Sequence, residues 1–157
     1  MIENVVRLYS DLGKVDEMEM LLEIFTEFNQ VGEALLQLHC GIIRFYAMMD
    51  RLDDVEFSVG KMMSQGMSFK SPSDVEKVIS SYFRQGAYER LDLFLEHIKR
   101  YFKLTRSTYD LLVAGYRRAG IDGEIEFSDG GYDIGRIIVS WLLMLSSDKF
   151  RLAQLSC

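Results

Sequence analysis

The sequence predicts an all-α protein, an α-solenoid of about four helix-turn-helix repeats followed by an irregular C-terminal helix. Three observations support this prediction. A junction pattern recurs every 34 to 37 residues, apolar residues lie at helical spacing on both sides of the junctions, and no strand pattern of comparable length is found. The apolar stripes are wider than one partner helix can cover, so neighbouring helix pairs are expected to stack.

The junctions share an aromatic residue that lies four positions before a glycine or an aspartate. The four pairs are Tyr9 and Gly13, Tyr46 and Asp50, Tyr82 and Gly86, and Tyr116 and Gly120. A helix that must end and reverse within a few residues needs left-handed backbone, which glycine adopts without a Cβ clash and aspartate tolerates better than most residues. The pattern predicts helix turns at these positions and repeats at about 1–35, 36–71, 72–105 and, as a partial unit, 106–120.

Apolar periodicity predicts the helices themselves. In the third unit the apolar residues fall at i, i+3, i+4, i+7 and i+8, and they are Val75, Val78, Ile79, Tyr82 and Phe83. Apolar residues recur at similar spacing after the junctions, within 18–25, 55–63 and 91–98. Residues 73–76, Ser-Asp-Val-Glu, have the form of a capping box that opens the third unit, with Pro72 just before the helix.

The fourth unit departs from this pattern. Residues 121–131 are rich in glycine and acidic residues and are predicted to form a loop. Residues 132–157 are predicted to be an irregular C-terminal helical segment. Within it, 132–145 is apolar on nearly all sides, so it is expected to pack against the last repeat or against a second copy of the chain. The second arrangement would give a homodimer through the C-terminal segment.

Composition and motifs exclude several classes of function. The net charge of −6 opposes nucleic-acid binding over the whole surface, although a local basic stripe is compatible with it. Cys40 and Cys157 do not have the spacing of metal ligands, and the acidic stretch 122–127 has Phe127 where a calcium loop requires glycine. The apolar run 137–145 is too short to span a membrane. We therefore expect no catalysis, no cofactor and no membrane span.

One helix face collects arginine residues. Residues four apart share a face of a helix. The first helix of each unit then contributes one arginine to the corresponding face, and these residues are Arg7, Arg44, Arg84 and Arg118. Two interpretations remain open: a solvated face with intrahelical pairs between acids and arginines, or a track that contacts the phosphate groups of RNA.

Two sets of motifs point to a known family. Residues 108–120, Thr-Tyr-Asp-Leu-Leu-Val-Ala-Gly-Tyr-Arg-Arg-Ala-Gly, match the first half of a repeat, and 51–56 with 62–67 match the second half. In these motifs the chain resembles the pentatricopeptide repeat family over roughly residues 1–120. The main alternative is the tetratricopeptide family, with a period of roughly 34 residues. Its repeats need a proline after the second helix, whereas this chain contains a single proline, Pro72.

The resemblance implies single-stranded RNA as the ligand, with one repeat per base. In the family, the fifth residue of the first helix and the last residue of the repeat read the base. The fifth positions correspond to Glu3, Cys40, Glu76 and Asp110, and the closing positions to about Leu35, Ser71 and Thr105. The family prefers Asn, Thr or Ser at the fifth position. None occurs here, so a base code cannot be carried over.

The sequence thus predicts a non-catalytic single-stranded RNA-binding factor of the helical-repeat type. By resemblance it would act in organelle RNA metabolism, in splicing, processing or stabilisation, in a plastid or a mitochondrion. Protein partners are expected, and a transit peptide is not expected within this chain because Met1 lies almost at the first repeat. The alternative is a protein–protein interaction scaffold, which the acidic pI of about 5.0 and the acidic fifth positions favour.

Overall fold

The chain is described by a computed structural model that covers residues 2–28 and 32–120. This part is entirely helical, which confirms the predicted all-α class. Its helices are α1 (Ile2–Asp11), α2 (Val15–Glu27), α3 (Glu33–Met48), α4 (Leu52–Ser64), α5 (Pro72–Gln85), α6 (Tyr88–Ile98) and α7 (Arg106–Arg118). The predicted loop at 121–131 and the predicted helical segment at 132–157 lie outside the described residues.

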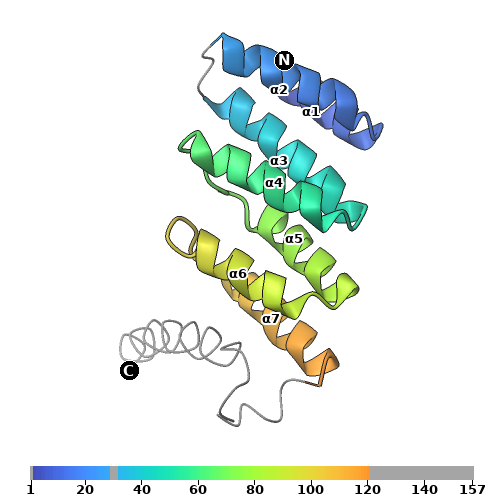
Figure 1. Ribbon diagram of the computed structural model, residues 1–157, viewed down its shortest axis with the longest axis vertical. Coiled ribbons are helices and arrows are strands. Elements are labelled where there is room, and N and C mark those ends of the chain that lie inside the picture. Colours follow the sequence, from blue (N-terminus) through green and yellow to red (C-terminus); the bar gives the residue numbers. More distant parts are fainter. Residues whose placement is uncertain (1, 29–31, 121–157) are drawn as a thin grey trace, which may run out of the picture.

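The helices follow one another along the long axis of the molecule, from α1 at one end to α7 at the other (Figure 1). α1 contacts α3, α3 contacts α5, and α5 contacts α7, so the first helices of the units form one continuous layer. The second helices pack on this layer: α2 on α1 and α3, α4 on α3 and α5, and α6 on α5. Because α3 begins at Glu33, the predicted start of the second unit at 36 lies inside a helix.

The four predicted helix turns are confirmed. The backbone has a positive φ at all four, with values of 67° at Gly13, 54° at Asp50, 62° at Gly86 and 74° at Gly120. Asp50 is the one residue other than glycine with a positive φ in the described part of the chain. Its Oδ1 accepts a hydrogen bond of 2.8 Å from the hydroxyl of Ser81, so contacts with the next helix pair help to hold this turn.

The junction aromatics have a role that their spacing did not reveal. Three junction tyrosines are buried, and each donates a hydrogen bond to a carboxylate on the second helix of the preceding pair. The bonds run from Tyr46 to Glu19 at 2.6 Å, from Tyr82 to Glu56 at 3.0 Å and from Tyr116 to Asp92 at 2.9 Å. Since burial and the adjacent carboxylate both disfavour the phenolate, the pKa of each tyrosine is raised. A repeated tyrosine–carboxylate bond therefore links each helix pair to the next.

Glycine permits the close contact between α5 and α7. A Cβ atom added at Gly115 would lie 2.2 Å from the ring of Phe83. That ring also packs edge-on against Tyr116, with 5.2 Å between the ring centroids. The helix axes approach because Gly115 has no side chain, and an aromatic cluster fills the space beside it.

The predicted capping box at 73–76 is wrong. The helix begins at Pro72, the N-cap is Ser71, and no side chain caps the first turn. Asp74 is instead buried against α3, and Glu76 accepts hydrogen bonds from the start of α7. Both carboxylates have partners in neighbouring helices, so neither is available to the local backbone. Pro72 itself is the first helical residue, a position where its missing N–H is not needed.

Candidate nucleic-acid interface

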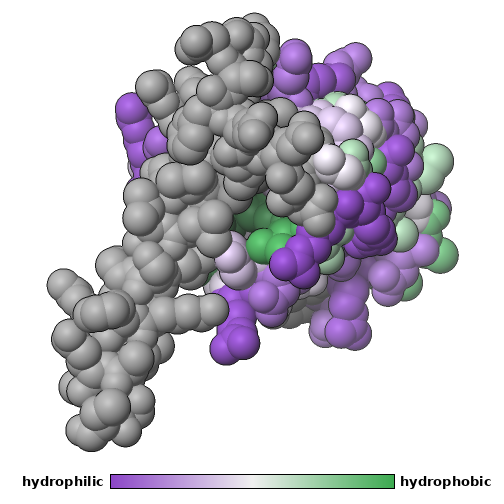
Figure 2. Space-filling view, turned by 90° about the horizontal axis from the view of Figure 1, so that it is seen from below, coloured by the Kyte–Doolittle hydropathy of each residue, from purple (hydrophilic) through white to green (hydrophobic). Residues whose placement is uncertain are grey.

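The four predicted arginines all lie on the first-helix layer, one each on α1, α3, α5 and α7. Arg7 is exposed on α1. The other three differ in how much of the guanidinium is available, because the acids of the neighbouring units approach them to different extents. Seen from the α7 end, the described surface is mostly hydrophilic with smaller apolar areas (Figure 2).

Arg44 belongs to the packing between α3 and α5. Its Nη1 lies 3.4 Å from Oδ1 of the buried Asp74. Burial raises the pKa of Asp74, although the charge of Arg44 opposes that shift. The neighbouring Cys40, a predicted base-reading position, is buried, and burial raises the pKa of its thiol to about 12. Both Cys40 and Arg44 are thus directed at protein groups rather than at solvent.

Arg84 is anchored but not covered. Its Nε donates to Oδ1 of Asp50 at 2.9 Å, and its Nη2 donates to the carbonyl of Ala47 at 3.0 Å. Nη2 also forms an ion pair with Oδ1 of Asp50 at 2.8 Å. The Arg84 guanidinium is the main reason that the pKa of Asp50 is lowered. With 48% of its side chain exposed, Arg84 still presents part of the guanidinium to solvent. Asp50 therefore orients this arginine and offsets much of its charge.

Arg118 is the freest of the three. It is exposed, and its Nε donates a long hydrogen bond of 3.4 Å to the carbonyl of Ala114, one turn earlier. Among the described residues no carboxylate pairs with it. Its charge is therefore available to a ligand.

Arg84 and Arg118 line one hollow between α5 and α7, which we call the α5–α7 hollow. Its volume is about 450 Å³, and its lining residues are Ser80, Phe83, Arg84, Tyr88, Leu111, Gly115, Arg118 and Ala119. None of these lining residues is acidic. In a chain with a net charge of −6, two arginines, two hydroxyls and two aromatic rings thus surround one open site.

The other predicted base-reading positions on α5 and α7, Glu76 and Asp110, are acidic and less suited than the arginines to contact RNA. Glu76 Oε1 accepts hydrogen bonds from the hydroxyls of Ser107 at 2.5 Å and Thr108 at 3.0 Å, so it joins α5 to α7. Asp110 is exposed and pairs loosely with Arg106 at 4.0 Å. Glu76 is therefore engaged in the packing of α5 against α7 rather than free to contact a base.

The closing positions lie at helix starts or in the core. Ser71 is the exposed N-cap of α5, and Thr105 is the N-cap of α7, where its side chain accepts from the N–H of Thr108 at 3.4 Å. Leu35 is buried in α3. Glu3 lies in α1, but its side chain is outside the described structure.

Arg44 and Arg84 do not form the intrahelical ion pairs that were one of the two interpretations of the arginine face. Both pair with aspartates about 30 residues away in sequence, Asp74 and Asp50. The signal that could have identified Asp50 is its place at a junction otherwise occupied by glycine. Asp74 carried no comparable signal, because its burial depends on how α3 and α5 pack.

None of the described helices is both long enough and apolar enough to cross a membrane. In comparisons with known proteins, no family model matches the chain, and no curated protein matches it.

Proposed function

We propose that the protein is an α-solenoid of pentatricopeptide-like repeats that binds single-stranded RNA without catalysis, in organelle RNA metabolism. The observation that carries this proposal is the α5–α7 hollow, where Arg84 and Arg118 come together without an acidic residue in the lining. Guanidinium groups suit phosphate because they donate through two N–H groups at once.

The mechanism is electrostatic capture with little base selection. Arg118 contacts a phosphate directly, and Arg84, held by Asp50, presents its remaining donors to the next one. An unstacked base can lie against the aromatic wall formed by Phe83 and Tyr88. Two phosphate contacts correspond to a slope of log affinity against log salt of about −1.4, so the affinity falls only gently with salt.

A binding titration tests this proposal. Fluorescence anisotropy would be measured with short mixed-sequence single-stranded RNA at low and at physiological salt. Arg118→Glu reverses the charge of an exposed residue and should lower the affinity about tenfold or more, because it removes a charge-assisted contact. Arg84→Glu is a poor probe, since it would place a second carboxylate beside Asp50 and disturb the fold.

The matched control is Arg106→Glu, which makes the same charge change on the same helix. Arg106 is exposed and lies at the opposite end of α7, about 18 Å from Arg118 along the helix axis. Its RNA affinity should stay within about twofold of the wild type, as expected for a distant surface charge at physiological salt. If the wild type binds no RNA at low salt, or if both variants lose affinity equally, the protein-scaffold hypothesis takes the place of this proposal.

A further inference from the structure

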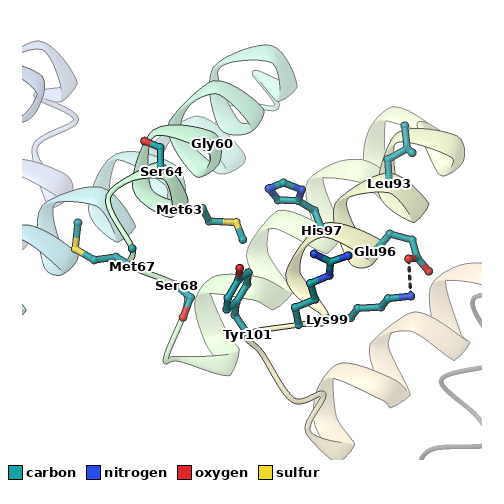
Figure 3. A pocket seen from close by; sticks show the side chains of 12 residues that line it. Gly60, Met63, Ser64, Met67, Ser68, Leu93, Glu96, His97, Lys99 and Tyr101 are labelled. Atoms are coloured by element: carbon teal, nitrogen blue, oxygen red, sulfur yellow. Dashed lines mark ion pairs between the residues drawn. The ribbon is translucent and has the colours of Figure 1, made fainter.

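A second and larger groove lies between α4 and α6, on the layer formed by the second helices (Figure 3). Its volume is about 820 Å³. Met63 and His97 point into this α4–α6 groove from the two helices, and Tyr101 enters it from the segment after α6. Gly60 leaves the α4 wall bare, because a Cβ atom added there would meet no atom within 4 Å.

The lining of the α4–α6 groove combines exposed apolar side chains with polar and basic ones. Leu93 and Tyr101 are 71% and 63% exposed, so both present apolar area to solvent at this groove. Of the cations in the lining, Lys99 is paired with Glu96 at 2.5 Å, whereas Arg100 has no ion-pair partner within the described residues. The groove therefore suits an apolar surface that carries negative charge.

Such a surface lies at the other end of the same chain, on α2. Met20, Ile24 and Phe28 are 63%, 45% and 71% exposed, and they lie at i, i+4 and i+8, on one face of the helix. This α2 stripe is about 12 Å long. The helix Val15–Glu27 carries five acidic residues and no lysine or arginine.

We propose that the protein associates with itself by inserting the α2 stripe of one copy into the α4–α6 groove of another. Figure 1 shows why this contact must join two copies: α2 lies in the first helix pair, and α4 separates it from α6. The acidic flanks of α2 then face Arg100, while Met20, Ile24 and Phe28 cover Leu93 and the other apolar walls. Flexible methionine at Met63 and Met67 lets the groove adapt to the incoming side chains.

Two such contacts related by a two-fold axis close the assembly as a dimer. Each copy then both donates its α2 stripe and receives the partner's, so every stripe and every groove is filled. The buried area is twice that of a single contact, which helps a short helix stripe to reach the size of a stable interface. This inference is independent of the α5–α7 hollow, which lies on the other layer.

Sedimentation velocity or light scattering of the full chain over a range of concentrations tests the proposal. Phe28→Asp removes the stripe, and Leu93→Asp removes a groove wall; both residues are exposed, so the helical circular dichroism should not change. Each single variant should dissociate at concentrations where the wild type is dimeric. An equimolar mixture should form more dimer than either variant alone but less than the wild type, because the mixed dimer keeps one of the two contacts intact.

Leu8→Asp is the matched control, since Leu8 is 55% exposed on α1, in the layer of the first helices, and belongs to neither the α2 stripe nor the groove. Its dimerisation should equal that of the wild type, and dimerisation should weaken at high salt and in Arg100→Glu. A wild type that is monomeric at every concentration would overturn the proposal. So would a dimer that withstands both Phe28→Asp and Leu93→Asp but is lost when residues 132–145 are changed.

Discussion

The buried bond between Tyr116 and Asp92 makes a strong prediction about stability. Asp92 is 6% exposed, and burial raises the pKa of its carboxyl from an ordinary value of 3.8 to about 6. The ionised carboxylate is therefore disfavoured in the folded state relative to the unfolded chain. A shift of this size corresponds to a cost of about 3 kcal/mol at pH values above both pKa values.

Asp92→Asn removes that charge and retains an amide oxygen that can accept from Tyr116. We expect the free energy of unfolding to rise by about 1–3 kcal/mol at pH 8. The sign follows from linkage: a raised pKa in the folded state costs stability as pH rises from about 4 to about 6, and costs nothing below that window. The gain should therefore vanish near pH 3.5.

Urea denaturation of both proteins at pH 8 and at pH 3.5, followed by circular dichroism, measures this difference. Asp110→Asn is the matched control, because Asp110 is exposed on α7 and its pairing distance to Arg106 is 4.0 Å. The control should change stability by less than about 0.5 kcal/mol. A variant no more stable than the wild type at pH 8, or one whose gain is the same at both pH values, would refute the reasoning.

Three further predictions concern single sites. Gly115→Ala should destabilise the protein by about 1–3 kcal/mol, because the new methyl group meets the ring of Phe83. Gly60→Ala should stabilise it by up to about 1 kcal/mol, because alanine has the higher helix propensity and its methyl group meets no atom. Thermal denaturation of the two variants compares these effects. His39 is buried, and burial is the main cause of its lowered pKa. The wild type should therefore lose stability relative to His39→Leu as the pH falls below about 6.5. Denaturation of both proteins from pH 7.5 to pH 5 measures this, and the same pH dependence in both would contradict it. Asp50→Ala should cost about 1–3 kcal/mol, because it keeps a side chain at positive φ and loses the carboxylate contacts, and Asp50→Gly should recover part of the loss in the same urea assay.

The sequence by itself determined the features that depend on local chemistry. Helical class follows from apolar spacing, and the turns at Gly13, Asp50, Gly86 and Gly120 follow from the left-handed backbone that a tight reversal requires. These properties belong to a few consecutive residues, so no knowledge of the neighbouring helices is needed. The burial of Tyr82 follows for the same reason, from its place on the apolar face of the third unit.

Only the tertiary structure decided which polar groups meet. A capping box at 73–76 was expected to close the first turn of its own helix, yet Asp74 within it is buried beside Arg44 on another helix, and Arg84 is held by Asp50 from the preceding junction. Such pairs depend on how far one helix is rotated and shifted against the next, which is set by side-chain packing such as that of Phe83 against Gly115. Sequence spacing fixes which face of its own helix a residue occupies. The packing of the helices decides which residues that face meets, and therefore which charged groups stay unpaired and available to a ligand.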